Sequence, residues 1–227
     1  MKKYFILVIS FCLFIPFLSA QQEMMKVACI GDGSTEGYGA SDMSRTSYVE
    51  QLKRLLGRRY IVENFGSDEA TACRNTDKPY ASLEICNAAM EFEPNIVIIS
   101  LGTSDSQAEV WNTGDCAKNF EADLAFLCKK LEELPTKPEI YLCLPAPILP
   151  NNQSTHQPRV LEREIIPAIR RVANANRYTL VNFNLAFQNC TDCNSVDDNL
   201  FPNDKGHRLM AERAYVAIIK NRMKNNP

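Results

Sequence analysis

The apolar and polar positions along the chain follow two alternating patterns, one typical of buried strands and the other of amphipathic helices. Short apolar runs bounded by glycine, proline or polar residues predict five strands, at residues 25–30, 60–65, 95–101, 139–144 and 178–183. Helical spacing predicts helices at 47–56, 80–92, 160–175 and 206–220, and a further one whose apolar face runs from Phe120 to Leu131. Strands that alternate with helices imply a single α/β domain, with a parallel sheet covered on both faces.

The first twenty residues have the pattern of a secretory signal peptide. Lys2 and Lys3 precede an almost wholly apolar stretch. The small residues Ser19 and Ala20 then fit a signal-peptidase cleavage site after Ala20. The apolar stretch is short for a membrane span, and polar sequence follows at once. We therefore expect a signal peptide at 1–20, one mature domain at 21–227, a secreted or periplasmic location, and no membrane span after cleavage. An uncleaved N-terminal anchor is the alternative.

Charge limits the classes of partner that the sequence predicts, and the cysteines suggest further sites. The chain has 25 basic and 27 acidic side chains and no basic block, so neither nucleic acid nor an anionic membrane is an expected partner. Of nine cysteines, all but Cys12 lie beyond the expected cleavage site, and several sit in apolar runs where Cys packs as a small core residue. Cys190 and Cys193 are separated by two residues, which fits a small disulfide loop, a redox pair or half of a metal site; no second ligand pair has zinc-like spacing.

Four polar segments lie where the sheet would place a ligand. In parallel α/β sheets, ligands bind beyond the carboxyl ends of the strands. Three segments directly follow the first three predicted strands, and the fourth precedes the last predicted helix. They read G-D-G-S-T-E-G-Y-G at 31–39, N-F-G-S-D-E-A-T at 64–71, G-T-S-D-S at 102–106 and D-N-L-F-P-N-D-K-G at 198–206.

In their order and placement, these segments resemble the four sequence blocks of the SGNH (GDSL-like) hydrolases, over essentially the whole mature chain. The resemblance implies that family's fold, a three-layer α/β/α sandwich around a flavodoxin-like five-stranded parallel sheet. It also implies acyl-ester hydrolysis without a cofactor: a Ser attacks the ester, a His takes its proton, and a Gly N–H and an Asn side chain hold the oxyanion. The pattern is closest to carbohydrate-active acyl esterases, so a glycan or an acyl ester is the expected ligand.

The positions that carry this chemistry in the family are all replaced in this chain. The replacements are Gly33 for the nucleophilic Ser, Glu69 for the oxyanion Gly, Ser104 for the Asn and Phe201 for the His. The acidic positions of the same blocks are retained, at Asp32, Asp105 and Asp198. Losing either the nucleophile or the base removes most of the rate enhancement, and losing one oxyanion donor costs about 100- to 1000-fold. We therefore expect an inactive member, kept for binding a ligand or partner.

A displaced catalytic centre is the alternative within the enzyme class. Ser34 follows the usual nucleophile position by one residue, and Asp204 with His207 forms a second D-x-x-H string. A shift of one residue re-aims a side chain, and Asp204 with His207 fits a helix cap and surface pair. The other histidine, His156, is expected to be a solvated loop residue.

Two further interpretations remain open. The carboxylates of Asp32, Glu69, Asp105 and Asp198 could converge on a cation, although we expect them to point apart and bond to backbone N–H groups, so that no metal is bound. A purely structural or assembly subunit, with no ligand, is the third class of function.

Overall fold

The computed structural model describes residues 24–112, 115–152, 154–197 and 199–225. The expected signal peptide at 1–20 and Asp198 lie outside these residues. Among the described residues, none of the helices has the length and apolar character that a membrane crossing needs.

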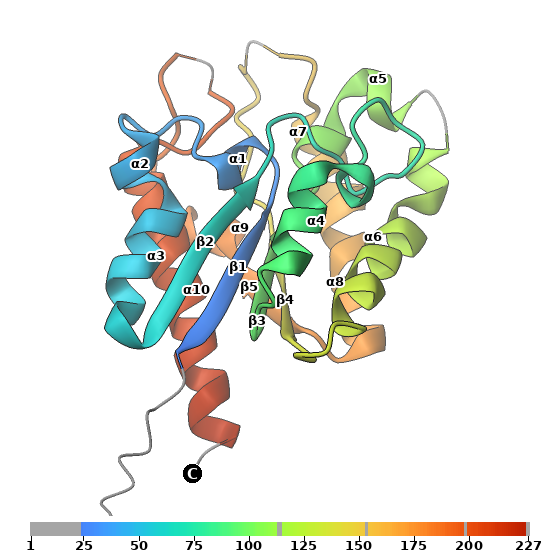
Figure 1. The fold of residues 1–227 in the computed structure, drawn as a ribbon. Coiled ribbons are helices and arrows are strands. Elements are labelled where there is room, and N and C mark those ends of the chain that lie inside the picture. The colour runs from blue at the N-terminus through green and yellow to red at the C-terminus, as the bar shows by residue number, and fades with distance from the viewer. Residues whose placement is uncertain (1–23, 113–114, 153, 198, 226–227) are drawn as a thin grey trace, which may run out of the picture.

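The centre of the molecule is a five-stranded parallel sheet in the order β2-β1-β3-β4-β5 (Figure 1). The strands are β1 (Met25–Gly31), β2 (Tyr60–Gly66), β3 (Ile96–Ser100), β4 (Glu139–Leu144) and β5 (Thr179–Asn182). All four pairings are parallel; Val27 of β1, for example, lies opposite Val62 of β2 and Ile96 of β3. The connections reverse direction between β1 and β3, the position where doubly wound sheets bind ligands. This is the predicted fold class.

Helices cover both faces of the sheet and complete three layers (Figure 1). One face packs on α4 (Glu84–Glu91), α6 (Cys116–Glu132) and α8 (Ile166–Asn176), and the other on α3 (Tyr48–Leu56) and α10 (Asp204–Asn225). Successive side chains of β1 show the division, because Val27 and Cys29 belong to the second core and Ala28 and Ile30 to the first. Short helices lie between these elements: α1 (Gly33–Glu36), α2 (Met43–Thr46), α5 (Ala108–Trp111), α7 (Pro158–Val160) and α9 (Phe183–Ala186).

Two predicted helices are interrupted. The segment 80–92 begins with a 3-10 turn at Tyr80–Ser82 before α4 starts. The segment 160–175 contains a π-helical turn at Leu161–Ile165 between α7 and α8. Pro167 in the first turn of α8 has no N–H to bond to the carbonyl four residues earlier, which favours a wider turn there.

Two disulfides tie loops at the carboxyl end of the sheet. Cys190–Cys193 closes a small loop, one of the three alternatives that the sequence left open. Cys73–Cys116 joins the loop after β2 to the first residue of α6, a pairing that the sequence did not indicate. The remaining cysteines of the described chain are buried and free: Cys29, Cys86, Cys128 and Cys143.

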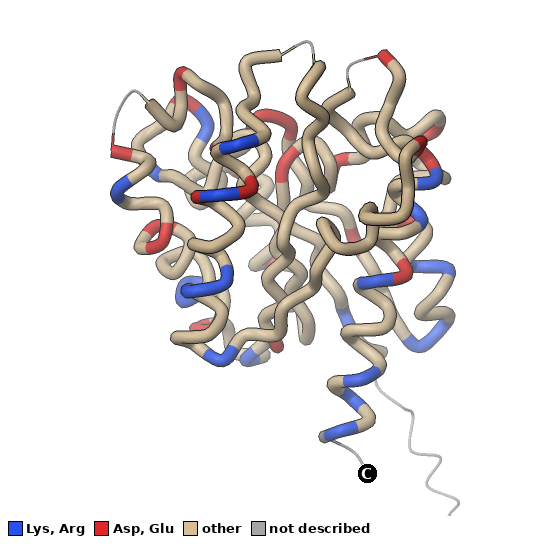
Figure 2. Tube along the Cα trace, turned by 180° about the vertical axis from the view of Figure 1, so that it is seen from behind, with Lys and Arg blue, Asp and Glu red and all other residues tan. Residues whose placement is uncertain are grey.

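Charge is distributed unevenly along the molecule. Figure 2 shows lysines and arginines gathered toward the end where α10 finishes, whose last turn contains Arg222 and Lys224. Several aspartates and glutamates lie at the opposite end, where the strand-following loops meet (Figure 2).

Candidate functional site

Asp32 joins the first and third motif segments beneath the site. It follows β1 and caps α1: Oδ1 accepts a hydrogen bond from the Ser34 N–H at 3.2 Å, and Oδ2 accepts one from the Thr103 N–H at 3.2 Å. The residue is 1 % exposed, and burial raises its pKa to about 7. These bonds orient the carboxylate toward the backbone, so Asp32 fixes the relative positions of the two loops.

The space beside Gly33, the residue that the sequence resemblance sets at the nucleophile position, is already filled. A Cβ atom added to Gly33 would collide with Asp68 Oδ1 and would lie 2.9 Å from two ring carbons of Phe201. The Phe201 ring also packs against Tyr38, with 5.4 Å between ring centroids. The Phe201 ring therefore fills the space into which a side chain at position 33 would project. We call the Phe201 ring the Phe201 plug.

Glu69 and Ser104, which the sequence resemblance sets at the oxyanion positions, differ in backbone conformation and burial. Glu69 has φ of 58°, in the left-handed region that favours glycine, and its side chain is exposed. Ser104 is buried and begins a 3-10 turn after β3. Glu69 therefore retains the conformation of a glycine position while adding a carboxylate, and Ser104 offers a hydroxyl in place of an amide.

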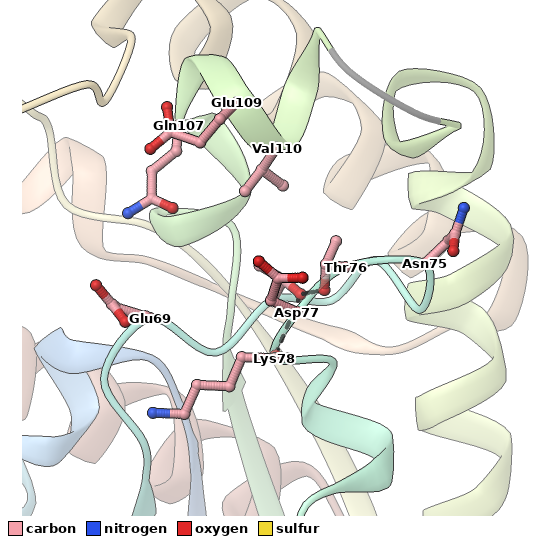
Figure 3. A pocket seen from close by; sticks show the side chains of 9 residues that line it. Glu69, Asn75, Thr76, Asp77, Lys78, Gln107, Glu109 and Val110 are labelled. Atoms are coloured by element: carbon pink, nitrogen blue, oxygen red, sulfur yellow. Dashed lines mark hydrogen bonds between the residues drawn. The ribbon is translucent and has the colours of Figure 1, made fainter.

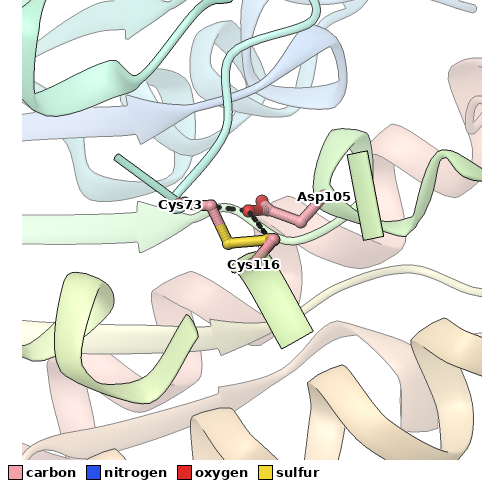
Figure 4. Close-up of side chains that lie close together, drawn as sticks. All are labelled: Cys73, Asp105 and Cys116. Atoms are coloured by element: carbon pink, nitrogen blue, oxygen red, sulfur yellow. Dashed lines mark hydrogen bonds between the residues drawn. A yellow bond between two sulfur atoms is a disulfide. The ribbon is translucent and has the colours of Figure 1, made fainter. Parts of the chain in front are cut away.

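Asp105 supports the cleft loop. It is fully buried and accepts hydrogen bonds from the N–H groups of Ala72, at 3.0 Å, and Cys73, at 2.9 Å. Burial raises the pKa of Asp105 to about 6. The adjacent Cys73–Cys116 disulfide lies against this carboxylate (Figure 4). Because the two sulfurs are bonded to each other, they are not thiolate ligands for a metal.

Of the four acidic positions, the three that the structure describes, Asp32, Glu69 and Asp105, do not form a common cation site. Among the described residues, the side-chain groups close enough to share an ion are Cys73–Asp105–Cys116 and Cys190–Asp192–Cys193, and each contains a disulfide. Asp32 and Asp105 instead bond separately to backbone N–H groups.

His207 is a buried structural residue rather than a surface one. Its Nδ1 accepts a hydrogen bond from the Tyr48 N–H at 3.1 Å, and its Nε2–H donates to the Tyr38 carbonyl at 2.9 Å. Burial lowers the pKa of His207, which fits the neutral ring that these bonds require. Both ring nitrogens are therefore occupied by backbone groups, and neither is available to take a proton from Ser34.

Asp204 does not orient His207, as a displaced catalytic centre would require. Its carboxylate accepts hydrogen bonds from the Ser41 N–H and hydroxyl, at 2.7 and 2.6 Å, and from the Thr46 hydroxyl at 2.7 Å. It holds the start of α10 to the loop around α2. The surface pair that we expected between Asp204 and His207 is not formed, because each has its own partners.

A serine and a histidine do meet elsewhere, in the loop that follows β4. Ser154 Oγ lies 2.8 Å from His156 Nδ1, and His156 is half-buried rather than fully solvated. Ser154 Oγ also donates to Asn152 Oδ1 at 2.5 Å, and the same oxygen accepts the Ser154 N–H. In this arrangement the Ser154 hydroxyl donates to Asn152 Oδ1 rather than to His156 Nδ1.

A cleft opens beside Glu69, between the loop after β2 and α5. Its volume is about 470 Å³. Figure 3 shows Gln107 and Glu109 projecting from one wall, and Glu69, Asp77 and Lys78 from the other. The remaining lining residues are Thr71, Asn75, Thr76 and Val110. A cleft of this size with many hydrogen-bonding groups suits a small polar ligand.

The rim between Gly33 and the cleft is negatively charged. Asp68 donates its N–H to Glu36 Oε2 at 2.6 Å. Burial, followed by the charges of Glu69 and Glu36, raises the pKa of Asp68. The carboxylates of Asp68 and Glu36 likewise raise the pKa of the half-buried Tyr38. A negative field at this point disfavours the charge that develops on an ester carbonyl during attack.

The chain matches the model of a known family over most of its length. The model of the GDSL-like lipase/acylhydrolase family matches residues 29–209, a range that includes all four motif segments. The chain belongs to this family. An acetylxylan esterase from Xylanibacter ruminicola is 32 % identical over 212 residues, which are 87 % of this chain but 44 % of that protein. The chain therefore spans less than half the length of the curated relative it matches.

Solved structures of this family share its fold with the chain. Est24, a carbohydrate acetylesterase from Sinorhizobium meliloti, has a TM-score of 0.68 at 16 % identity and covers 87 % of this chain and 99 % of its own. The acetyl xylan esterase AlAXEase has a TM-score of 0.67 at 20 % identity, with 86 % and 100 % covered.

Sequence reasoning missed two residues of the site in this family member. Asp68 stands where the second block of the family has a serine, directly before Glu69, and could have been noticed by the same alignment. Tyr38 carries no motif signal; its role follows from the packing of its ring on Phe201 and from its carbonyl bond to His207.

Proposed function

We propose that this protein is a secreted, non-hydrolytic member of the family that binds a glycan or an acylated glycan in its cleft. The observation that carries the proposal is the occupied space at Gly33, where the Asp68 carboxylate and the Phe201 plug leave no room for a nucleophile. Without a hydroxyl at position 33 and an imidazole at position 201, a bound ester would meet neither an attacking group nor a base.

The ligand class is supported by the cleft and by the relatives. Amide, hydroxyl, carboxylate and ammonium groups line the cleft, and these are the groups that bind sugar hydroxyls. Relatives include an acetylxylan esterase and a carbohydrate acetylesterase, so acetylated xylo-oligosaccharides are the first ligands to test. Secretion would follow from the proposed signal peptide at 1–20 and would place the protein where such glycans occur.

Two assays test the absence of hydrolysis. A fluorophosphonate probe should leave the mature protein unlabelled, and hydrolysis of p-nitrophenyl acetate should not exceed that of an unrelated protein. Labelling that is lost in Ser34→Ala would establish the displaced hydrolase instead. Labelling lost in Ser154→Ala would assign activity to the Ser154–His156 pair.

Calorimetry with acetylated and deacetylated xylo-oligosaccharides tests the binding role. We expect binding that falls at least tenfold in Gln107→Ala and in Lys78→Ala, because both side chains line the cleft. Lys118→Ala is the matched control, since Lys118 is an exposed lysine on α6 outside the cleft. Absence of binding to any glycan tested, with the fold intact, would favour a structural subunit.

A reconstruction tests whether side chains alone account for the loss of catalysis. The changes are Gly33→Ser, Asp68→Ser, Glu69→Gly, Ser104→Asn and Phe201→His. Recovered ester hydrolysis would support a preserved backbone site; a folded but inactive product would show that the loop geometry has also diverged.

A further inference from the structure

The Cys190–Cys193 disulfide is accessible in a way that the other disulfide is not. Cys190 is partly exposed, whereas Cys193, Cys73 and Cys116 are 1–3 % exposed. An external thiol can therefore approach the sulfur of Cys190 but neither sulfur of Cys73–Cys116. The Cys190–Cys193 bond also closes a loop with a sequence separation of 3 rather than 43, so it contributes less stability to the fold and is easier to break.

The small disulfide loop clasps the segment that carries the Phe201 plug. The Asn203 N–H donates to the Cys193 carbonyl at 2.9 Å, and the Asn203 side-chain amide donates to the carbonyls of Asp192, at 2.8 Å, and Asn194, at 3.0 Å. On the other side of the plug, the Ser195 N–H donates to the Phe201 carbonyl at 2.7 Å. The backbone at 201 and 203 is thus bonded directly to residues within and just after the disulfide loop.

An ion pair between Lys205 and Asp192 also joins the disulfide loop to the segment after the Phe201 plug, and it changes the charge beside Cys190. Lys205 Nζ lies 2.6 Å from Asp192 Oδ1, and that oxygen lies 3.4 Å from Cys190 Sγ. Lys205 therefore offsets the negative charge that would otherwise repel an approaching thiolate.

We propose that Cys190–Cys193 is a thiol–disulfide exchange site for an external dithiol, and that its reduction releases the Phe201 plug from Gly33. The proposal depends on the packing of the plug and not on the absence of hydrolysis. Opening the plug exposes the edge of the site at Gly33 and so links access to this edge to the redox state of the surroundings.

The exchange is a two-electron reduction of the protein by the dithiol. A thiolate of the dithiol attacks Cys190 Sγ, forming a mixed disulfide and breaking the Cys190–Cys193 bond, and the departing Cys193 thiolate takes up a proton. The second thiol of the reagent, as a thiolate, then attacks the reagent sulfur that is bonded to Cys190 Sγ. Cys190 leaves as a thiolate and is protonated, and the reagent ends as a disulfide.

Hydrogen exchange on the oxidised mature protein tests the proposal, with dithiothreitol as the dithiol and mass spectrometry of alkylated peptides to follow each disulfide. Dithiothreitol should reduce Cys190–Cys193 at concentrations that leave Cys73–Cys116 intact. In that state the amide protons of Ser195 and Asn203 should exchange at least tenfold faster. The amide protons of Ala72 and Cys73, which Asp105 holds, are the internal control and should not change.

A paired-serine variant provides a second measurement. Cys190→Ser with Cys193→Ser should show the same fast exchange at Ser195 and Asn203 without any reductant. If this variant does not fold, reduction of the wild-type protein still decides the matter. Unchanged exchange at Ser195 and Asn203 after reduction would overturn the link to the plug, and reduction of Cys73–Cys116 first would overturn the exchange site.

Discussion

The Phe201 plug can be tested by a double-mutant cycle on stability, using Gly33→Ala and Phe201→Ala. In the wild-type background a methyl group at position 33 has no space, and forcing extra atoms into packed surroundings costs about 1–3 kcal/mol. Gly33 has no positive φ and lies in α1, so the backbone itself accepts alanine. Once the ring is removed, Gly33→Ala should instead stabilise the protein by about 0.4–1 kcal/mol, because alanine reduces the conformational entropy of the unfolded chain.

The sign of the Gly33→Ala effect should therefore reverse between the two backgrounds. Asp68 Oδ1 also lies near the added atom, but it ends a half-buried side chain that can rotate away. The measurement is the free energy of unfolding in urea for the four proteins, which gives a coupling energy of at least about 1 kcal/mol. Phe126 on α6 is the control partner, because its ring is not among the atoms that a Cβ at Gly33 would meet.

Gly33→Ala combined with Phe126→Ala should be additive to within about 0.5 kcal/mol. If the coupling of Gly33 with Phe201 is as small as this, the ring does not occupy the nucleophile position in solution, and the structural argument for an inactive site fails.

Three further predictions concern the residues around the site. Replacing Cys73 and Cys116 by Ser should lower the free energy of unfolding by about 4 kcal/mol in denaturant titrations, because the bond closes a loop with a sequence separation of 43; a loss below about 1 kcal/mol would contradict this. Burial raises the pKa of Asp32 to about 7, so its contribution to stability is complete below the unfolded-state pKa near 4 and is lost as the pH rises through 7. Unfolding measured from pH 4 to pH 8 should depend less on pH in Asp32→Asn, and an unchanged slope would refute the assignment. His207→Ala should lower the free energy of unfolding by roughly 2–5 kcal/mol, because it leaves a cavity and two unpaired backbone groups. The same substitution should leave any background ester hydrolysis unchanged.

The fold could be predicted from the sequence because its elements are defined by local patterns. The run 140–144 is apolar and is followed by proline, and the predicted strand 139–144 coincides with β4. The other predicted strands differ from the observed ones by one residue at one or both ends. The breaks in the helices were not predicted. In α8 the proline is visible in the sequence, but apolar spacing alone does not show how the chain widens its turn around it.

For the candidate site, the sequence indicated which positions to compare with the family but not the contacts that these residues make. Alignment by motif singled out Gly33 and Phe201, and the structure shows that a Cβ at position 33 would collide with the Phe201 ring. That His207 is buried between two backbone groups depends on how α10 packs against α3, which no local pattern reports. The Cys73–Cys116 bond is similar, since eight cysteines allow many pairings and only the folded chain selects one.

The contact between Gly33 and Phe201 constrains the order in which this sequence can change over generations. A serine that arose first at position 33 would clash with the ring at position 201 and cost about 1–3 kcal/mol of stability. A smaller side chain at position 201 would have to come earlier to make room. Substitutions at these two positions are therefore expected to occur together among descendants of this gene.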